Sequence, residues 1–266
     1  SPAVANNNAD FDGDSYTDIE EYLNELAAFP APITLIFGGT LNSRWEQCQN
    51  WSLSWQPSRF DAVQINSGTV QVDSVCQQAR SLSLAAAGGS TATLQVTNGW
   101  IDIRETLSVG SVGTGSVAQS GGLVRTGASI VLGNAGTVVT YALFGGTLAT
   151  PLLAKGNANS NFDFTNGVLH ADQVAFSLVN NGGVIAPGSD EQLQIIAAAS
   201  MPDITGNVES VQSFIGDTHI NGDLMLQGGS LQIDLASLTS FDTITVDGTL
   251  SLGGVLEVVL DNGYEP

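Results

Sequence analysis

The stretch ATLQVTNGWIDIRE, residues 92–105, alternates apolar and polar side chains on both sides of a glycine turn. Alternation with a period of two is typical of a β-strand that buries one face. The stretch therefore predicts two short strands joined by a corner, with a third strand directly after them. The expected inward side chains are Leu94, Val96, Ile101, Ile103, Leu107 and Val109.

The same pattern recurs along the chain, at residues 62–73, 116–126, 139–150, 162–172, 224–235 and 244–252. The turn glycines Gly99, Gly122, Gly146 and Gly167 are 23, 24 and 21 residues apart, a spacing that indicates the coil of a solenoid rather than a hairpin. Three short strands per coil predict a parallel β-helix, whose coils stack about 4.8 Å apart. The alternative is an antiparallel β-sandwich or jelly roll, because its strands also alternate. Residues 189–222 are less regular, and we expect an excursion or an irregular coil there.

The charge balance excludes several partners. The chain of 266 residues has 26 acidic and 6 basic side chains, for a net charge of −20. Such a surface repels nucleic acid and anionic lipid. No apolar run is long enough to span a membrane, so membrane insertion is not expected. The chain starts at Ser1 rather than at Met, which we interpret as a piece of a longer polypeptide with flanking domains.

Residues 10–21, DFDGDSYTDIEE, fit the calcium-binding loop of an EF-hand. Such a loop supplies oxygen ligands at positions 1, 3, 5, 7, 9 and 12. Ser15 departs from the pattern, since the sixth position is normally Gly; the alternative interpretation is a solvated acidic linker. The predicted Ca²⁺ ligands are Asp10, Asp12, Asp14, the backbone carbonyl of Tyr16, Asp18 and Glu21.

A helix is expected after the loop. Thr17 and Glu20 fit a capping box, and Pro30 and Pro32 end the helix. Residues 18–24, DIEEYLN, resemble single calcium motifs at domain junctions of secreted bacterial enzymes, including the ends of some pectate lyases, and dockerin-like segments. Dockerins carry two such loops, so cohesin binding is not expected. The resemblance implies a structural calcium that rigidifies a connector.

A second resemblance covers residues 33–266. Residues 180–195, NNGGVIAPGSDEQLQI, resemble an element of autotransporter-type passenger repeats, and residues 231–266 resemble the stretch that follows it there. Residues 189–191 depart from that pattern, which usually has Ser-Pro-Gly. The opening, with Trp45, Trp51 and residues 62–66, resembles planctomycete-type secreted surface proteins. These families imply a right-handed parallel β-helix that is exported or on the cell surface, and they carry no fixed catalytic set.

The domain organisation that we expect has three parts. Residues 1–9 are a linker, residues 10–32 are the calcium loop and its helix, and residues 33–266 are the β-helix, with residues 33–61 as its N-terminal cap. Trp45, Trp51 and Trp55 are candidates for stacking on a glycan; the alternative is that they seal the end of the core. Cys48 and Cys76 predict a disulfide, or else two buried thiols.

Few residues are candidates for catalysis. We expect His170 to face the surface and His219 to lie in a polar turn, and neither has the spacing of a triad or a metal site. The carboxylate pairs Asp163 with Asp172 and Asp234 with Asp242 carry little weight in so acidic a chain. A lyase would need a basic groove, and the arginines are scattered.

The expected function is that of a non-catalytic, extracellular structural or adhesion module of a larger secreted or surface protein. One alternative is a carbohydrate-binding or polysaccharide-lyase-like module. Another is a subunit of an extracellular filament or surface layer, with self-association of the chain.

Overall fold

The structure, a computed structural model, describes residues 33–74, 76–134, 136–188 and 215–260. The expected linker, calcium loop and connector helix within residues 1–32 lie outside these ranges, as do residues 189–214 and 261–266. Residues Thr34–Pro266 form one unit of the chain, separate from Ser1–Ile33. The described part of this unit is almost entirely β-structure, and its single 3-10 helix is η1, Cys48–Asn50.

The strands before the middle of the chain are mostly short. They are β1 Thr34–Ile36, β2 Ala62–Ile65, β3 Ser67–Val72, β4 Gln77–Ala79, β5 Ser81–Leu84, β6 Thr91–Val96, β7 Trp100–Ile103, β8 Thr106–Val109, β9 Thr114–Thr126 and β10 Ser129–Leu132.

Later strands run around corners and are longer. They are β11 Val139–Lys155, β12 Ser160–Val174, β13 Leu178–Pro187, β14 Asp217–Ile220, β15 Leu224–Ser237, β16 Ser240–Phe241, β17 Thr243–Val246, β18 Leu250–Leu252 and β19 Val255–Leu260.

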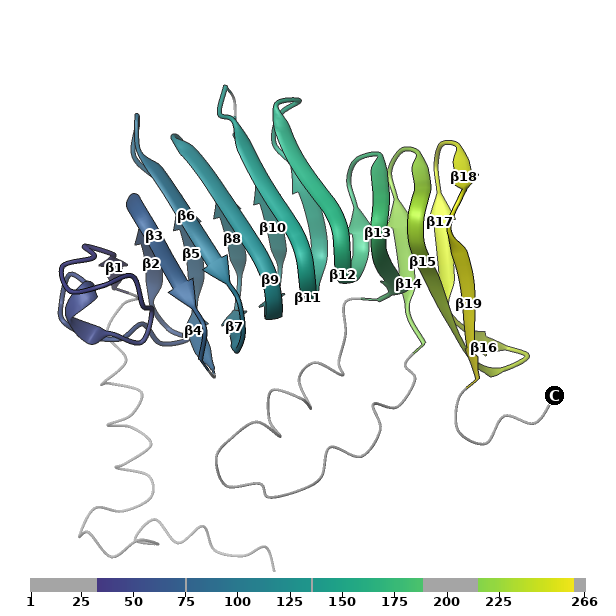
Figure 1. Ribbon diagram of the computed structural model, residues 1–266, viewed down its shortest axis with the longest axis horizontal. Helices are drawn as coiled ribbons and strands as arrows, with labels where there is room; N and C mark the ends of the chain where they lie inside the picture. The colour runs from purple at the N-terminus through teal and green to yellow at the C-terminus, as the bar shows by residue number, and fades with distance from the viewer. Residues whose placement is uncertain (1–32, 75, 135, 189–214, 261–266) are drawn as a thin grey trace, which may run out of the picture. The chain divides into compact units, whose positions relative to one another are not determined.

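These strands stack into eight coils with three faces (Figure 1). The first sheet contains β1, β2, β5, β8, β10, the ends of β11 and β12, β14 and β17. The second sheet starts with β3 and β6 and ends with β18. The third starts with β4 and β7 and ends with β19. Within the described ranges all pairings of named strands are parallel, except that β16 folds back antiparallel on β15. The parallel β-helix is therefore confirmed, and the sandwich is excluded.

The register confirms the coil length that the glycines predicted. Leu94 pairs with Val117, 23 residues later, and Tyr141 pairs with Phe162, 21 residues later. Inside the coils, the first sheet forms one ladder of fully buried aliphatic side chains. Its members are Val63, Leu82, Leu107, Ile130, Leu153, Val174 and Ile220.

The corner between the second and third sheets requires glycine. Gly99, Gly122, Gly146 and Gly167 all have positive φ. A Cβ at Gly122 would lie 2.1 Å from the carbonyl oxygen of Gly99 in the preceding coil, and one at Gly146 would lie 2.3 Å from that of Gly122. Any side chain here would push neighbouring coils apart, so these glycines fix the stacking distance.

Two coils depart from the regular length, and the sequence did not indicate the first of them. Leu169 pairs with Ile185, only 16 residues later, so one coil is short. Leu178 pairs with Leu224, 46 residues later, and this separation includes residues 189–214. An excursion was expected over residues 189–222, but residues 217–220 already form the regular strand β14. Among the described residues no helix is long and apolar enough to cross a bilayer.

Candidate functional site

All three candidate tryptophans lie in the cap, residues 33–61, and two of them are buried. Trp45 is 0% exposed and Trp51 is 2% exposed. Their ring centroids lie 4.9 Å apart, and Phe37 packs 5.3 Å from Trp51 on another side. The Trp51 indole Nε1 donates a hydrogen bond to the Trp45 carbonyl at 2.8 Å. This burial favours the interpretation in which the two rings seal the end of the core.

Trp55 differs from the other two. Its side chain is 58% exposed, and no aromatic ring among the described residues packs against it. The structure therefore brings Trp45 and Trp51 together but does not combine all three rings into a platform. A sugar ring could reach Trp55 alone without opening the cap.

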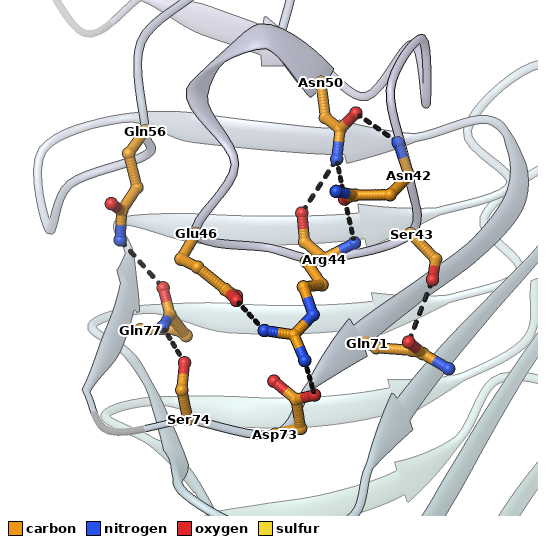
Figure 2. A network of polar contacts seen from close by, with 10 residues as sticks. All are labelled: Asn42, Ser43, Arg44, Glu46, Asn50, Gln56, Gln71, Asp73, Ser74 and Gln77. Carbon is orange, nitrogen blue, oxygen red and sulfur yellow. Dashed lines mark hydrogen bonds and ion pairs between the residues drawn. The ribbon is translucent and has the colours of Figure 1, made fainter.

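A polar network holds the cap in place (Figure 2). Asn50 is 1% exposed, and its side-chain oxygen accepts hydrogen bonds from the backbone amides of Leu41 at 3.0 Å and Asn42 at 3.2 Å. Its side-chain nitrogen donates to the Asn42 Oδ1 and to the Arg44 carbonyl, each at 2.9 Å. One buried amide thus fixes the loop that carries Arg44. A buried amide with every group bonded specifies one loop conformation.

Arg44 connects the cap to the first coil. Its guanidinium forms ion pairs with Glu46 at 3.1 Å and with Asp73 at 3.2 Å, as Figure 2 shows. The Ser43 hydroxyl also donates to Gln71 Oε1 at 2.9 Å, and Gln56 donates to Gln77 at 2.9 Å. These contacts join the cap to the second and third sheets.

Three of the other cations in the coils are also engaged. Arg80 pairs with Glu105 at 2.8 Å, and Arg125 pairs with Asp102 at 3.3 Å, each pair linking neighbouring coils. The Lys155 ammonium lies 4.3 Å from the centre of the Phe176 ring, and burial lowers the pKa of this lysine. Arg104, in contrast, is exposed, so among the described residues not every cation of the coils is neutralised by a neighbour.

In the second acidic pair, Asp234 lies on β15 and Asp242 lies between β16 and β17. Asp242 is 5% exposed, and its carboxylate accepts hydrogen bonds from the amides of Gly216 at 2.7 Å and Asp234 at 2.9 Å. Burial raises the pKa of Asp242, the two amide bonds lower it, and the negative charges of Asp234 and Asp217 raise it further. Both carboxylate oxygens are occupied by backbone amides, which makes Asp242 a clamp between two chain segments.

The histidines do not join a catalytic arrangement. His170 lies on β12, in register with Ala149 and Ala186 on the third sheet. Burial lowers its pKa, against the opposing effects of the Asp234 charge and the Gly188 backbone. His219 lies 2.8 Å from Asp247. The expectation of a polar turn at His219 was wrong, because the residue belongs to strand β14.

The remaining acidic pair is separated by the fold. Asp163 lies on the part of β12 that pairs with the start of β11 in the second sheet. Asp172 is exposed and follows the part of β12 that belongs to the third sheet. The two residues therefore face different sides of the coil.

Cys48 and Cys76 are both free thiols in the structure, so the expected disulfide is not formed. Cys48 starts η1 in the cap, whereas Cys76 packs against Trp100, Leu123 and Ala149 on the third sheet. Burial, and secondarily the charge of Asp102, raises the pKa of the Cys76 thiol. Spacing along the chain did not indicate that the two cysteines belong to different packing environments.

The predicted calcium ligands Asp10, Asp12, Asp14, Tyr16, Asp18 and Glu21 lie outside the described residues. Within the described ranges, no group of three or more His, Cys, Asp or Glu side chains is arranged to hold a metal ion. The calcium site therefore stays a prediction from the sequence.

Sequence reasoning missed the polar residues that form buried hydrogen bonds inside the coils. Gln119 is fully buried, accepts a hydrogen bond from the Tyr141 hydroxyl at 2.7 Å and donates to the Thr147 carbonyl at 2.8 Å. Asn180 is also fully buried, and its oxygen accepts the amides of Gly182 and Gly183. The available signal was a polar residue at an inward position of the alternating pattern.

Comparison with known proteins adds no relative. No family model matches the sequence, and no curated protein or solved structure matches it at a significant level.

Proposed function

We propose that residues 33–266 are a non-catalytic structural module of an exported or cell-surface protein, joined to its neighbours by a calcium-stabilised connector at residues 10–32. The observation that carries this proposal is the continuous ladder of buried aliphatic side chains through consecutive coils. Each coil buries its inner face only against the next, so the stack behaves as one stiff unit. A stiff rod is suited to spacing or displaying other domains.

The outer surface of the coils supports the same proposal. Neighbouring coils are joined by polar contacts, such as the 2.8 Å hydrogen bond between the Thr93 and Ser116 hydroxyls and the ion pair of Arg80 with Glu105. A net charge of −20 keeps such a rod soluble and disfavours collapse onto anionic surfaces.

Calcium-dependent proteolysis tests the connector. We expect a chelator to expose residues 1–32 to cleavage while the coils stay intact, because self-repelling carboxylates lose their shared cation. Glu21→Gln should reproduce the effect of the chelator, and Glu25→Gln, a matched change outside the loop positions, should not. Equal cleavage with and without the chelator would contradict a bound calcium.

Glycan binding is a second candidate, favoured by the exposure of Trp55. We expect any retention on a polysaccharide panel to be lost in Trp55→Ala, which leaves the cap core untouched. Release of unsaturated sugars from the same panel would instead indicate a lyase and would overturn the non-catalytic proposal.

A further inference from the structure

Two acidic side chains are buried where β16 folds back on β15. Asp234, on β15, is 8% exposed, and Asp242, directly after β16, is 5% exposed. Between them the two strands pair antiparallel, and we call residues 234–242 the hairpin. The Asp234 amide donates to Asp242 Oδ2, and the Asp242 amide donates to the Asp234 carbonyl, each at 2.9 Å. The Asp242 carboxyl group therefore helps to close the base of the hairpin.

The same carboxyl group ties the hairpin to the first sheet. The amide of Gly216, the residue before β14, donates to Asp242 Oδ1 at 2.7 Å. The Thr243 amide donates in turn to the Gly216 carbonyl at 3.0 Å. One side chain thus holds the hairpin to its own first residue and to the start of β14, and opening of the hairpin would free both amides.

No cation compensates these two acids in the part of the chain that the structure describes. The sequence has no lysine or arginine after Lys155, and none of the ion pairs between described residues includes Asp234 or Asp242. Asp217, on β14, adds the repulsion of a third carboxylate to Asp242. His170, on β12, interacts electrostatically with Asp234, but its burial favours the neutral ring. Acids that are withdrawn from water next to like charges resist ionisation.

Protonation of Asp242 relieves this repulsion. Burial raises the pKa of Asp242 above its ordinary value of 3.8; the two amide hydrogen bonds lower it, and the charges of Asp234 and Asp217 raise it further. In an open hairpin the carboxyl group is in water, where it has its ordinary pKa. The closed hairpin therefore binds the proton more tightly than the open one, and raising the pH through this window favours opening.

We propose that the hairpin, residues 234–242, is a pH-sensitive element that is held closed in acid by a protonated Asp242 and opens more readily once this side chain is ionised. The inference goes beyond the proposed structural role and does not depend on it. It also has a sign that identifies it. The buried His170 destabilises the fold as the pH falls, whereas Asp242 destabilises the hairpin as the pH rises.

Hydrogen exchange of the full chain, followed by NMR, tests the proposal at the amides of Gly216, Asp234 and Asp242. Once the rates are corrected for the intrinsic effect of pH, protection should fall as the pH rises from 3.8. The fall should be at most about tenfold per pH unit, because one proton is linked to opening, and it should level off above the pKa of Asp242. Protection that is constant, or that increases with pH, would overturn the proposal.

Two substitutions separate the effect of Asp242 from the general charge of the chain. Asp242→Asn places a neutral group of the same shape at the base of the hairpin, so the pH dependence of the three amides should be lost. Asp247→Asn is the matched control, because Asp247 is 52% exposed and pairs with His219 rather than with the hairpin; it should keep the pH dependence. A dependence that survives in Asp242→Asn would overturn the proposal.

A direct titration needs no substitution and covers the case in which Asp242→Asn does not fold. The carboxyl carbon of Asp242 is followed by NMR in the parent chain as the pH is changed. We expect a midpoint above 3.8. A midpoint at or below this value would show that the closed hairpin does not favour the proton, and would overturn the proposal.

Discussion

The two ends of the described solenoid terminate in different ways. At the N-terminal end, the outer edge of β1 is covered by Ser52, whose amide donates to the Ile36 carbonyl at 2.9 Å and whose hydroxyl accepts from the Ile36 amide at 3.1 Å. Trp45 and Trp51 fill the core behind that edge. At the other end, β17, β18 and β19 have no comparable cover among the described residues, and their inward side chains are exposed.

This difference shows what a repeat can and cannot supply. Each coil provides the ladder that buries its neighbour, but no coil can bury its own outer side. Sealing an end therefore requires sequence that does not repeat, and residues 33–61 are of this kind. The comparison predicts that the same type of substitution has very different effects at the two ends.

The largest expected effect is at the sealed end. Trp45→Ala removes a fully buried ring that contacts Trp51 and should lower the free energy of unfolding by about 3–5 kcal/mol. Urea unfolding followed by circular dichroism measures the change. Trp55→Ala, at an exposed ring of the same cap, is the control and should change stability by about 0.5 kcal/mol or less. Equal losses in the two variants would show that the cap is not sealed by Trp45.

The next comparison uses two leucines in register. Leu226→Ala should lower the free energy of unfolding by about 2–5 kcal/mol, because it leaves a cavity in the core. Leu252→Ala removes the same atoms from an exposed position and should cost about 0.5 kcal/mol. Both are measured under dilute conditions in urea. A large loss in Leu252→Ala would show that Leu252 is covered in solution.

A smaller effect is expected from the amide that orders the cap. Asn50→Ala leaves the amides of Leu41 and Asn42 without their acceptor and should cost about 1–3 kcal/mol. Hydrogen exchange should accelerate at these two amides first. Gln49→Ala, an exposed neighbour in η1, should leave both exchange rates unchanged.

The sequence predicted the coils well because their pattern is local and repeated. Residues 92–105 became β6 and β7, and the expected inward residues Leu94, Val96, Ile101 and Ile103 are all 0% exposed. The spacing of the turn glycines gave the register, since a Cβ there would meet the backbone of the preceding coil. Alternation and glycine spacing together leave few other arrangements.

The short coil and the structure of the cap depend on contacts that have no periodic pattern in the sequence. The short coil requires Gly183, where a Cβ would lie 2.0 Å from the Phe164 ring, and the sequence shows only two adjacent glycines there. The role of Asn50 and the separation of Cys48 from Cys76 likewise depend on how the cap folds onto the first coil. The tryptophans of the cap could be recognised as a group, but their individual burial could not.

The smallest expected effect is a pH dependence of the free energy of unfolding that arises from His170 in the coils and not from the cap. Burial lowers the pKa of His170 in the folded state below its ordinary value of 6.5. In the window below that value the unfolded chain binds more protons, so the free energy of unfolding falls as the pH falls through it. A single proton changes stability by at most about 1.4 kcal/mol per pH unit. His170→Gln should remove this fall, which urea unfolding at several pH values would measure.

The location of the effect separates this prediction from general acid sensitivity. The cap contains no histidine, because the two histidines of the chain are His170 and His219. Lowering the pH through this window should therefore accelerate hydrogen exchange around β12 and β13, once the rates are corrected for the intrinsic effect of pH. The corrected rates of residues 41–50 should not change. His219→Gln is the matched control and should keep the fall that depends on His170. Faster exchange in residues 41–50 than around β12 and β13 would contradict the prediction, because it would show that the cap is the less stable region in acid.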